Sequence, residues 1–448
     1  TICSFFIRYN CCDLFGFLMA AHPFISGALE GFYGRPWRQD QRLQLFQWLE
    51  DWEGMNTYMY APKDDLYHRS NWRELYPDNS LKELKELIQS CHKKELGFIY
   101  SIAPGLDITY SSEDEWNLLI EKIEQIQNIG CKQFAILFDD IPLKLSEKDK
   151  KAYSSFAEAQ ANITNRLFDH FPNSKLLFCP TVYCGEMANY NVLGNEYLLE
   201  LGTKLNPNIG FFWTGPEVVS NDISVESIQE LRNVIKRKPI LWDNLHANDY
   251  DIRQIYFGPY VGRTLELKNE IDGILSNPNC QFWANYNPLR TLSQYQVAKT
   301  EWDPRQAFKD SSNEWIQYFW NADIYNEEIQ LLGDCFYVPG TMGEMGNQII
   351  ESINFILNHP PEECASHLVT FKSFEYRLNS LCTKLMATTN RDLMYDLYFP
   401  LIELREEIEY VSKWIEWKQS GTGEFQAPGL VPRRQGILYD IQNIVHNS

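Results

Sequence analysis

Positive charge, closely spaced cysteine pairs and long apolar runs are all scarce in this sequence of 448 residues. Forty Lys and Arg stand against sixty Asp and Glu, and the net charge of -20 argues against nucleic acid as a partner because such a surface repels phosphate. The 11 cysteines form no CxxC pair or Cys/His cluster, which argues against a zinc site. Beyond the N-terminal residues 1–21, no apolar run is long enough to cross a bilayer, so we expect no membrane association.

The N-terminal residues 1–21 form an extension of unclear status. Residues 14–21 resemble the apolar core of a signal peptide, but Asp13 and the missing basic cluster weaken that interpretation. Alternatively, Met19 is the natural start and residues 1–18 are upstream sequence. An odd number of scattered cysteines is typical of free thiols in a reducing compartment, so we expect a cytoplasmic or nuclear location.

Residues 22–305 repeat a short apolar run, a loop and a helix-period segment. Continuous rather than alternating hydrophobicity is typical of parallel strands buried on both faces. The expected strands are 24–30, 56–62, 96–103, 132–138, 174–180, 208–214, 238–243 and 281–286, and amphipathic segments between them include 81–94, 113–129, 147–170 and 225–237. Eight such units predict an α/β fold, a catalytic (β/α)8 TIM barrel. A doubly wound sheet is the alternative, but no GxGxxG turn follows the first strand.

The character of the sequence changes at about residue 306. Long helical patterns cover 344–358, 366–388 and 392–418, and few strand-forming runs occur. A Gly- and Pro-containing linker at 419–429 interrupts them. We therefore predict that residues 306–448 form an α-helical bundle, a separate domain from the barrel.

Two adjacent carboxylates, Asp139 and Asp140, follow the expected strand 132–138. In a TIM barrel the active site gathers at the carboxyl ends of the strands. Neighbouring strand residues face opposite ways, so both acids reach one ligand only if the strand ends there, which Pro142 supports. Mutual repulsion keeps one of them protonated to higher pH, which suits general acid catalysis. A solvated loop, a helix cap and a metal site are the competing interpretations of this pair.

Other polar and aromatic side chains follow the remaining expected strands at the same rim. Each of them alone is equally compatible with core packing, a turn or a helix cap. Their combination on one rim favours sugar binding, with aromatic rings against pyranose faces and amides or carboxylates at hydroxyls. The residues are Tyr33, Lys63, Tyr183, Trp213, Trp242, Asn244, Asp249 and Asn285.

Several runs are specific enough to resemble a known family. EGFYGRPW (30–37), YAPKDD (60–65), LFDDI (137–141), FCPTVYCG (178–185), WDNLHANDYD (242–251) and NPNCQFWANY (277–286) closely resemble the O-GlcNAcase family of glycoside hydrolases. Members of that family remove N-acetylglucosamine from serine and threonine of intracellular proteins. The helical region resembles the stalk domain of the animal enzymes at FYVPG (336–340) and GEFQ (423–426).

The resemblance implies a retaining, substrate-assisted mechanism in which the 2-acetamido oxygen attacks C1 to give an oxazoline, an exception to the nucleophilic carboxylate scheme. Asp139 would orient the acetamido N–H, and Asp140 would act as general acid and then general base. Residues implied to hold the sugar hydroxyls are Gly31, Lys63, Asn244, Asp249 and Asn285, and those implied to line the acetamido pocket are Tyr183 and Trp242. No metal or organic cofactor is implied.

Animal relatives dimerise through the stalk, so the resemblance implies a homodimer and O-GlcNAc-modified proteins as substrates. Val218, Val219 and Tyr250 would line a peptide cleft, to which the partner's stalk would add Trp417. Val182 and Met187 depart from the animal pattern at that cleft.

Competing functions have their own sequence marks. A chitinase-type enzyme would show a DxxDxDxE strand and a lysosomal hexosaminidase an Asp-Glu pair, and neither is present. Two further hypotheses are a relative that acts on extracellular glycans and a sugar-binding module without activity. The stalk resemblance argues against the first, and the intact Asp139 and Asp140 argue against the second.

Overall fold

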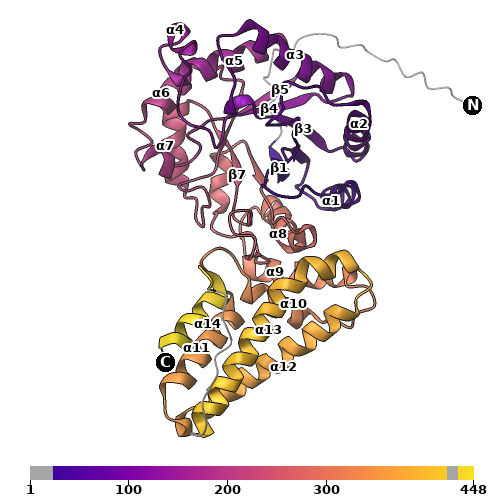
Figure 1. Ribbon diagram of the computed structural model, residues 1–448, viewed down its shortest axis with the longest axis vertical. Helices are drawn as coiled ribbons and strands as arrows, with labels where there is room; N and C mark the ends of the chain where they lie inside the picture. The colour runs from indigo at the N-terminus through magenta and orange to yellow at the C-terminus, as the bar shows by residue number, and fades with distance from the viewer. Residues whose placement is uncertain (1–23, 421–431, 448) are drawn as a thin grey trace, which may run out of the picture.

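The computed structural model describes residues 24–420 and 432–447, and Figure 1 shows two regions, a barrel wrapped in helices and a helical domain below it. The eight strands are β1 (Ile25–Glu30), β2 (Thr57–Tyr60), β3 (Gly97–Ile102), β4 (Gln133–Leu137), β5 (Lys175–Cys179), β6 (Gly210–Trp213), β7 (Pro239–Asp243) and β8 (Gly273–Ser276). Each strand pairs in parallel with the next, and β8 closes onto β1. The predicted TIM barrel is therefore confirmed; the segments 1–21 and GEFQ lie outside the described residues.

Helices surround the barrel, and the longer ones, such as α2 (Asp78–Lys93) and α3 (Glu113–Asn128), pack on it through one apolar face. They are α1 (Gln39–Asp51), α2 (Asp78–Lys93), α3 (Glu113–Asn128), α4 (Asp149–Ala152), α5 (Phe156–His170), α6 (Glu196–Lys204), α7 (Val225–Ile235) and α8 (Tyr286–Val297). In α2 the residues that face the strands are Leu84, Leu87 and Ile88, all buried. The segment 147–170, expected as one helix, is two helices, because the Ser155 side chain accepts from the Glu158 N–H and begins α5 anew.

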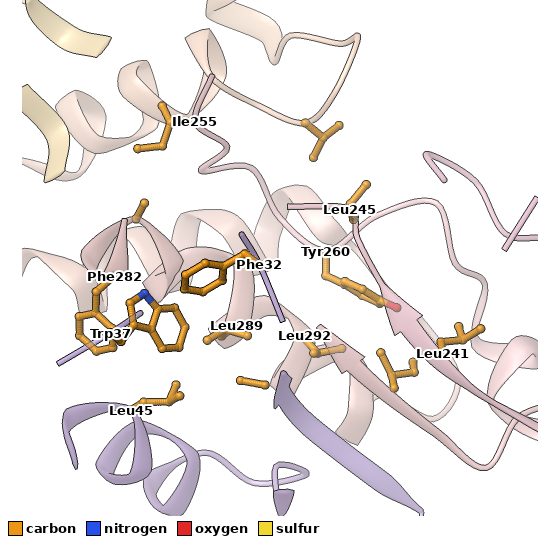
Figure 2. Close-up of a cluster of buried hydrophobic side chains, with 14 of the residues drawn as sticks. Phe32, Trp37, Leu45, Leu241, Leu245, Ile255, Tyr260, Phe282, Leu289 and Leu292 are labelled. Atoms are coloured by element: carbon orange, nitrogen blue, oxygen red, sulfur yellow. The ribbon is translucent and has the colours of Figure 1, made fainter. Parts of the chain in front are cut away.

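Two apolar clusters hold the barrel together. The smaller one fills the barrel interior with alternate strand residues such as Leu29, Met59 and Ile99. The larger one lies between the strands and the helices. Figure 2 shows part of it, where the Trp37 ring lies between Phe32 and Phe282.

The expected eighth strand at 281–286 is wrong. Its residues form a short 3-10 turn, η4 (Phe282–Asn285), that leads directly into α8, and β8 lies earlier in the chain. Phe282 stacks on Trp48 of α1 with 4.9 Å between ring centroids, so the apolar run packs outside the barrel. The true strand is only four residues long, and hydrophobicity alone does not distinguish so short a run from its neighbours.

The second region consists of α9 (Pro304–Trp315), α10 (Asn326–Cys335), α11 (Glu344–Asn358), α12 (Ala365–Ala387), α13 (Arg391–Ser420) and α14 (Gly436–Asn447). The three long helices predicted from the sequence correspond to α11, α12 and α13. The start of α13 packs against η4 of the barrel, where Asp396 Oδ2 accepts the Trp283 N–H at 2.9 Å. Within 24–420 and 432–447, no helix combines the length and hydrophobicity needed to cross a membrane.

Candidate active site

A cavity of about 270 Å³ opens at the carboxyl ends of the strands. It is lined by Gly31, Tyr33, Lys63, Asp139, Asp140, Cys179, Tyr183, Thr214, Val218, Val219, Trp242, Asn244, Ala247, Asp249, Tyr250 and Asn277. These residues come from most of the strand ends around the barrel, which is where barrel enzymes build their sites.

Both acids of the Asp139-Asp140 pair line this one cavity. The strand β4 ends at Leu137, so neither acid belongs to the regular pleat that would send them to opposite faces. Asp140 has a φ of +52°, in the left-handed region that Asp tolerates better than most residues. The left-handed turn lets two consecutive side chains share one cavity.

Asp139 is buried, with 8% of its surface exposed, and forms an ion pair with the ammonium of Lys63 at the end of β2. Burial alone would raise the pKa of Asp139, but the Lys63 charge and hydrogen bond outweigh it and hold that pKa below its ordinary value. Asp139 is therefore a carboxylate at neutral pH. Its other oxygen, Oδ1, is buried and has no hydrogen-bond partner among the described residues. Such an unpaired buried oxygen is uncommon in folded proteins, and it is free to accept a hydrogen bond from a bound molecule.

Asp140 is exposed at the cavity mouth and accepts two phenol hydrogen bonds. Tyr33 Oη donates to Oδ2 at 2.8 Å, and Tyr183 Oη donates to Oδ1 at 2.8 Å. Burial first, and the contact with Asp140 second, raise the pKa of both tyrosines, so both remain protonated donors. Asp139 and Asp140 thus have different environments, one paired with a buried cation and the other held by neutral donors.

One wall of the cavity is built from a chain of hydrogen bonds. The Gly31 N–H donates to Asn277 Oδ1 at 3.3 Å, Asn277 Nδ2 donates to Asn244 Oδ1 at 2.9 Å, and Asn244 Nδ2 donates to the Val218 carbonyl at 2.7 Å. Gly31 also makes room for the neighbouring ring, because a Cβ at this position would lie 2.6 Å from Cζ2 of Trp242.

A third carboxyl group, that of Asp249, also lines the cavity. Asp249 Oδ2 accepts the Tyr33 N–H at 2.8 Å, and burial raises the pKa of Asp249. Polar groups from several strand ends therefore line the cavity.

The structure brings together most, but not all, of the residues that the sequence singled out. Asn285 does not line the cavity: its Nδ2 donates to the carbonyls of Asn279, Gln281 and Phe282 in the η4 turn. Asn277, which directly follows β8, lies in the cavity instead. The run Gly273–Ser276 directly precedes Asn277, so assigning this run as the eighth strand would have placed Asn277 at the rim of the barrel. The prediction put that strand at 281–286 and therefore missed Asn277.

The expected peptide-side residues lie in two places. Val218, Val219 and Tyr250 line the outer part of the cavity, and Tyr250 Oη contacts Tyr256 Oη at 2.9 Å. Trp417 lies near the end of α13 in the helical domain and packs against Trp414, so it is not part of this chain's own cavity.

A closed barrel with a polar cavity at the carboxyl ends of its strands defines a class, the TIM-barrel enzymes. Comparison with known proteins places the chain more narrowly. The sequence model of the beta-N-acetylglucosaminidase family matches residues 26–329, and the chain belongs to this family.

Individual relatives agree with this assignment. The chain is 49% identical to mouse Protein O-GlcNAcase and 48% identical to the rat protein over 276 residues, or 61% of the chain. The match spans only 30% of the length of either relative. A mutant of the O-GlcNAc hydrolase of Thermobaculum terrenum has a similar structure, with a TM-score of 0.78, 29% identity and coverage of 87% of this chain and 83% of that one. The resemblance to the O-GlcNAcase family is confirmed.

Proposed function

We propose that this chain removes β-linked N-acetylglucosamine from serine and threonine of intracellular proteins by substrate-assisted, retaining hydrolysis. The observation that carries the proposal is the environment of Asp139 and Asp140. One is an ionised, buried carboxylate with a free oxygen, and the other is an exposed carboxyl at the cavity mouth. A sugar with an N–H beside its anomeric carbon offers the donor that Asp139 Oδ1 lacks.

In the first step the acetamido oxygen of the substrate attacks C1, and the bond from C1 to the serine or threonine oxygen breaks. Asp140 gives its proton to that oxygen, which leaves as an alcohol. Asp139 accepts the acetamido N–H and, as an anion, stabilises the positive charge that develops on the forming oxazoline ring. The Lys63 ammonium holds Asp139 in place and in its ionised form.

In the second step Asp140, now a carboxylate, removes a proton from water, whose oxygen attacks C1 and opens the oxazoline. The two inversions at C1 give net retention. The walls formed by Asn244, Asn277 and Asp249 present amide and carboxyl groups to the sugar hydroxyls, while Trp242 and Tyr183 enclose the acetamido group. A plain β-glucoside lacks the internal nucleophile, so this site offers no equivalent path for it.

Kinetics with aryl glycosides test the proposal. Asp140→Asn should reduce kcat/KM by about 10²–10⁴-fold for poor leaving groups and far less for activated ones, because it removes the general acid. Asp139→Asn should reduce turnover on all N-acetylglucosaminides. Asp107→Asn is the matched control, since Asp107 pairs with Arg73 outside the cavity. Efficient cleavage of a plain aryl β-glucoside by the wild type would contradict the mechanism.

Two further features support intracellular protein substrates and a homodimer. All eight cysteines of the described residues are free, as in a reducing compartment. The helical domain exposes large apolar side chains on α12 and α13, namely Tyr376, Tyr395 and Phe399, which suits a protein interface. We propose dimerisation through these helices, with Trp417 of one copy completing the peptide cleft of the other. Sedimentation of the wild type and of Phe399→Glu measures the oligomeric state and tests this proposal. A monomeric wild type would refute it.

A further inference from the structure

We propose that Arg69 is a positioning residue that acts on Asp140 through the hydroxyl of Tyr33. The inference rests on the proposed function and adds to it a residue outside the cavity that governs how Asp140 gains and loses its proton. The three residues come from the segments that follow β2, β1 and β4, and the sheet brings these segments to one rim.

The geometry is a hydrogen-bond relay. Arg69 Nη1 donates to Tyr33 Oη at 2.7 Å, and Tyr33 Oη donates to Asp140 Oδ2 at 2.8 Å. The guanidinium also lies over the Tyr33 ring, with Cζ 5.4 Å from the centroid. Arg69 does not line the cavity, and the hydroxyl of Tyr33 is its hydrogen-bond link to Asp140.

The contacts of Arg69 do not explain why its guanidinium is buried. The residue is 9% exposed, and within the described part of the chain it forms no ion pair, its one hydrogen bond being the one to Tyr33. A buried guanidinium whose one hydrogen-bond partner is neutral recovers little of its lost hydration, apart from its attraction to the Asp139 carboxylate. By contrast Arg73, on the same loop, pairs with Asp107 and Glu115.

The relay presents Asp140 with a strengthened hydrogen-bond donor. A phenol that accepts a charged N–H is a stronger donor to the next acceptor, and a carboxylate binds that donor better than a carboxylic acid does. When Asp140 carries a proton, one of its oxygens must turn away from the phenol that donates to it. Of the two phenols, Tyr33 is the freer to move, because it is 41% exposed and lies on the irregular segment before α1. Once Asp140 has given up its proton, the hydrogen bond from Tyr33 re-forms to the Asp140 carboxylate, which is the base of the second step.

Other charged groups face this relay and set the background for its pH dependence. Asp139 precedes Asp140, the Lys63 ammonium lies 5.9 Å from the Tyr33 ring centroid, and Asp249 accepts the Tyr33 N–H. Tyr183 donates to the other oxygen of Asp140. These contacts remain when Arg69 is replaced, but the Arg69 charge also lowers the pKa of Asp139 directly, and Arg69→Lys keeps that charge while it alters the relay.

The test is the pH profile of kcat/KM on an aryl β-N-acetylglucosaminide for wild type, Tyr33→Phe, Arg69→Gln and the double variant. The alkaline limb should move up by about one pH unit in Tyr33→Phe, a ten-fold change in the ionisation equilibrium, and in the same direction in Arg69→Gln. Because the residues act in series, the double variant should match Tyr33→Phe and not exceed it. Arg69→Lys should restore part of the shift.

Arg73→Gln is the matched control and should keep the wild-type profile. If Arg69→Gln does not fold, Tyr33→Phe with Arg69→Lys still decides the question, since one removes only a hydroxyl and the other keeps the charge. Alkaline limbs that coincide with wild type, or additive shifts in the double variant, would overturn the relay. A wild type without activity on the N-acetylglucosaminide would instead refute the proposed function.

Discussion

Replacing Lys63 by Met removes the cation that keeps Asp139 ionised while preserving most of the side-chain volume. The Lys63 side chain is 2% exposed and its partner 8%, so the pair is almost entirely withdrawn from water. In the variant, both oxygens of Asp139 would be buried without a donor, because Oδ1 already lacks one.

Breaking a buried ion pair by removing one partner costs about 3–5 kcal/mol, since the remaining charge is uncompensated. The pH dependence has a definite sign. In the wild type the lowered pKa of Asp139 contributes stability above the ordinary carboxyl value, and this contribution is lost as pH falls through the lowered pKa. In the variant, burial, the largest cause, is opposed only by the charge of Arg69 and a backbone hydrogen bond, so the pKa of Asp139 rises and its protonation relieves the strain as pH falls. The stability difference should therefore be largest near neutral pH and shrink towards pH 4.

Urea unfolding followed by tryptophan fluorescence at pH 7 and pH 4.5 measures this difference. Lys94→Met is the control, because Lys94 pairs with Glu50 at a partly exposed site, where about 0–1 kcal/mol is expected at both pH values. A loss below about 1 kcal/mol in Lys63→Met at pH 7, or a loss of equal size at both pH values, would refute the reasoning.

Three other predictions concern the cavity wall and the joint between the two regions. Gly31→Ala should displace the Trp242 ring and lower kcat/KM by more than ten-fold with little change in Tm, as steady-state kinetics and melting curves would reveal. Asn285→Ala should cost about 3 kcal/mol of stability through unsatisfied buried groups; an unchanged urea midpoint with a raised KM would instead support a sugar-binding role. Burial raises the pKa of Asp396 to about 7, so the joint loses stability as pH rises from about 4 to 7. Asp396→Asn should raise Tm more at pH 8 than at pH 5, and an equal change at both would count against it.

Much of the barrel was predictable because its information is local. Seven apolar runs are continuous enough to mark parallel strands, and the long helices of the second region have their own periodicity. The pair Asp139-Asp140 was also visible, since adjacency in the chain guarantees adjacency in space. The predicted position of the eighth strand was wrong because η4 carries the stronger hydrophobic run. That run packs on α1 and not in the sheet.

The sequence by itself determined the barrel, the helical domain and the place of the two acids at the end of β4. Only the tertiary structure decided which residues surround them: Lys63 lies 76 positions from Asp139 and Tyr33 lies 107 from Asp140. No local pattern encodes such distances. Closure of the sheet brings eight separate strand ends to one rim, and the charge and donors that give the two acids different environments exist only there.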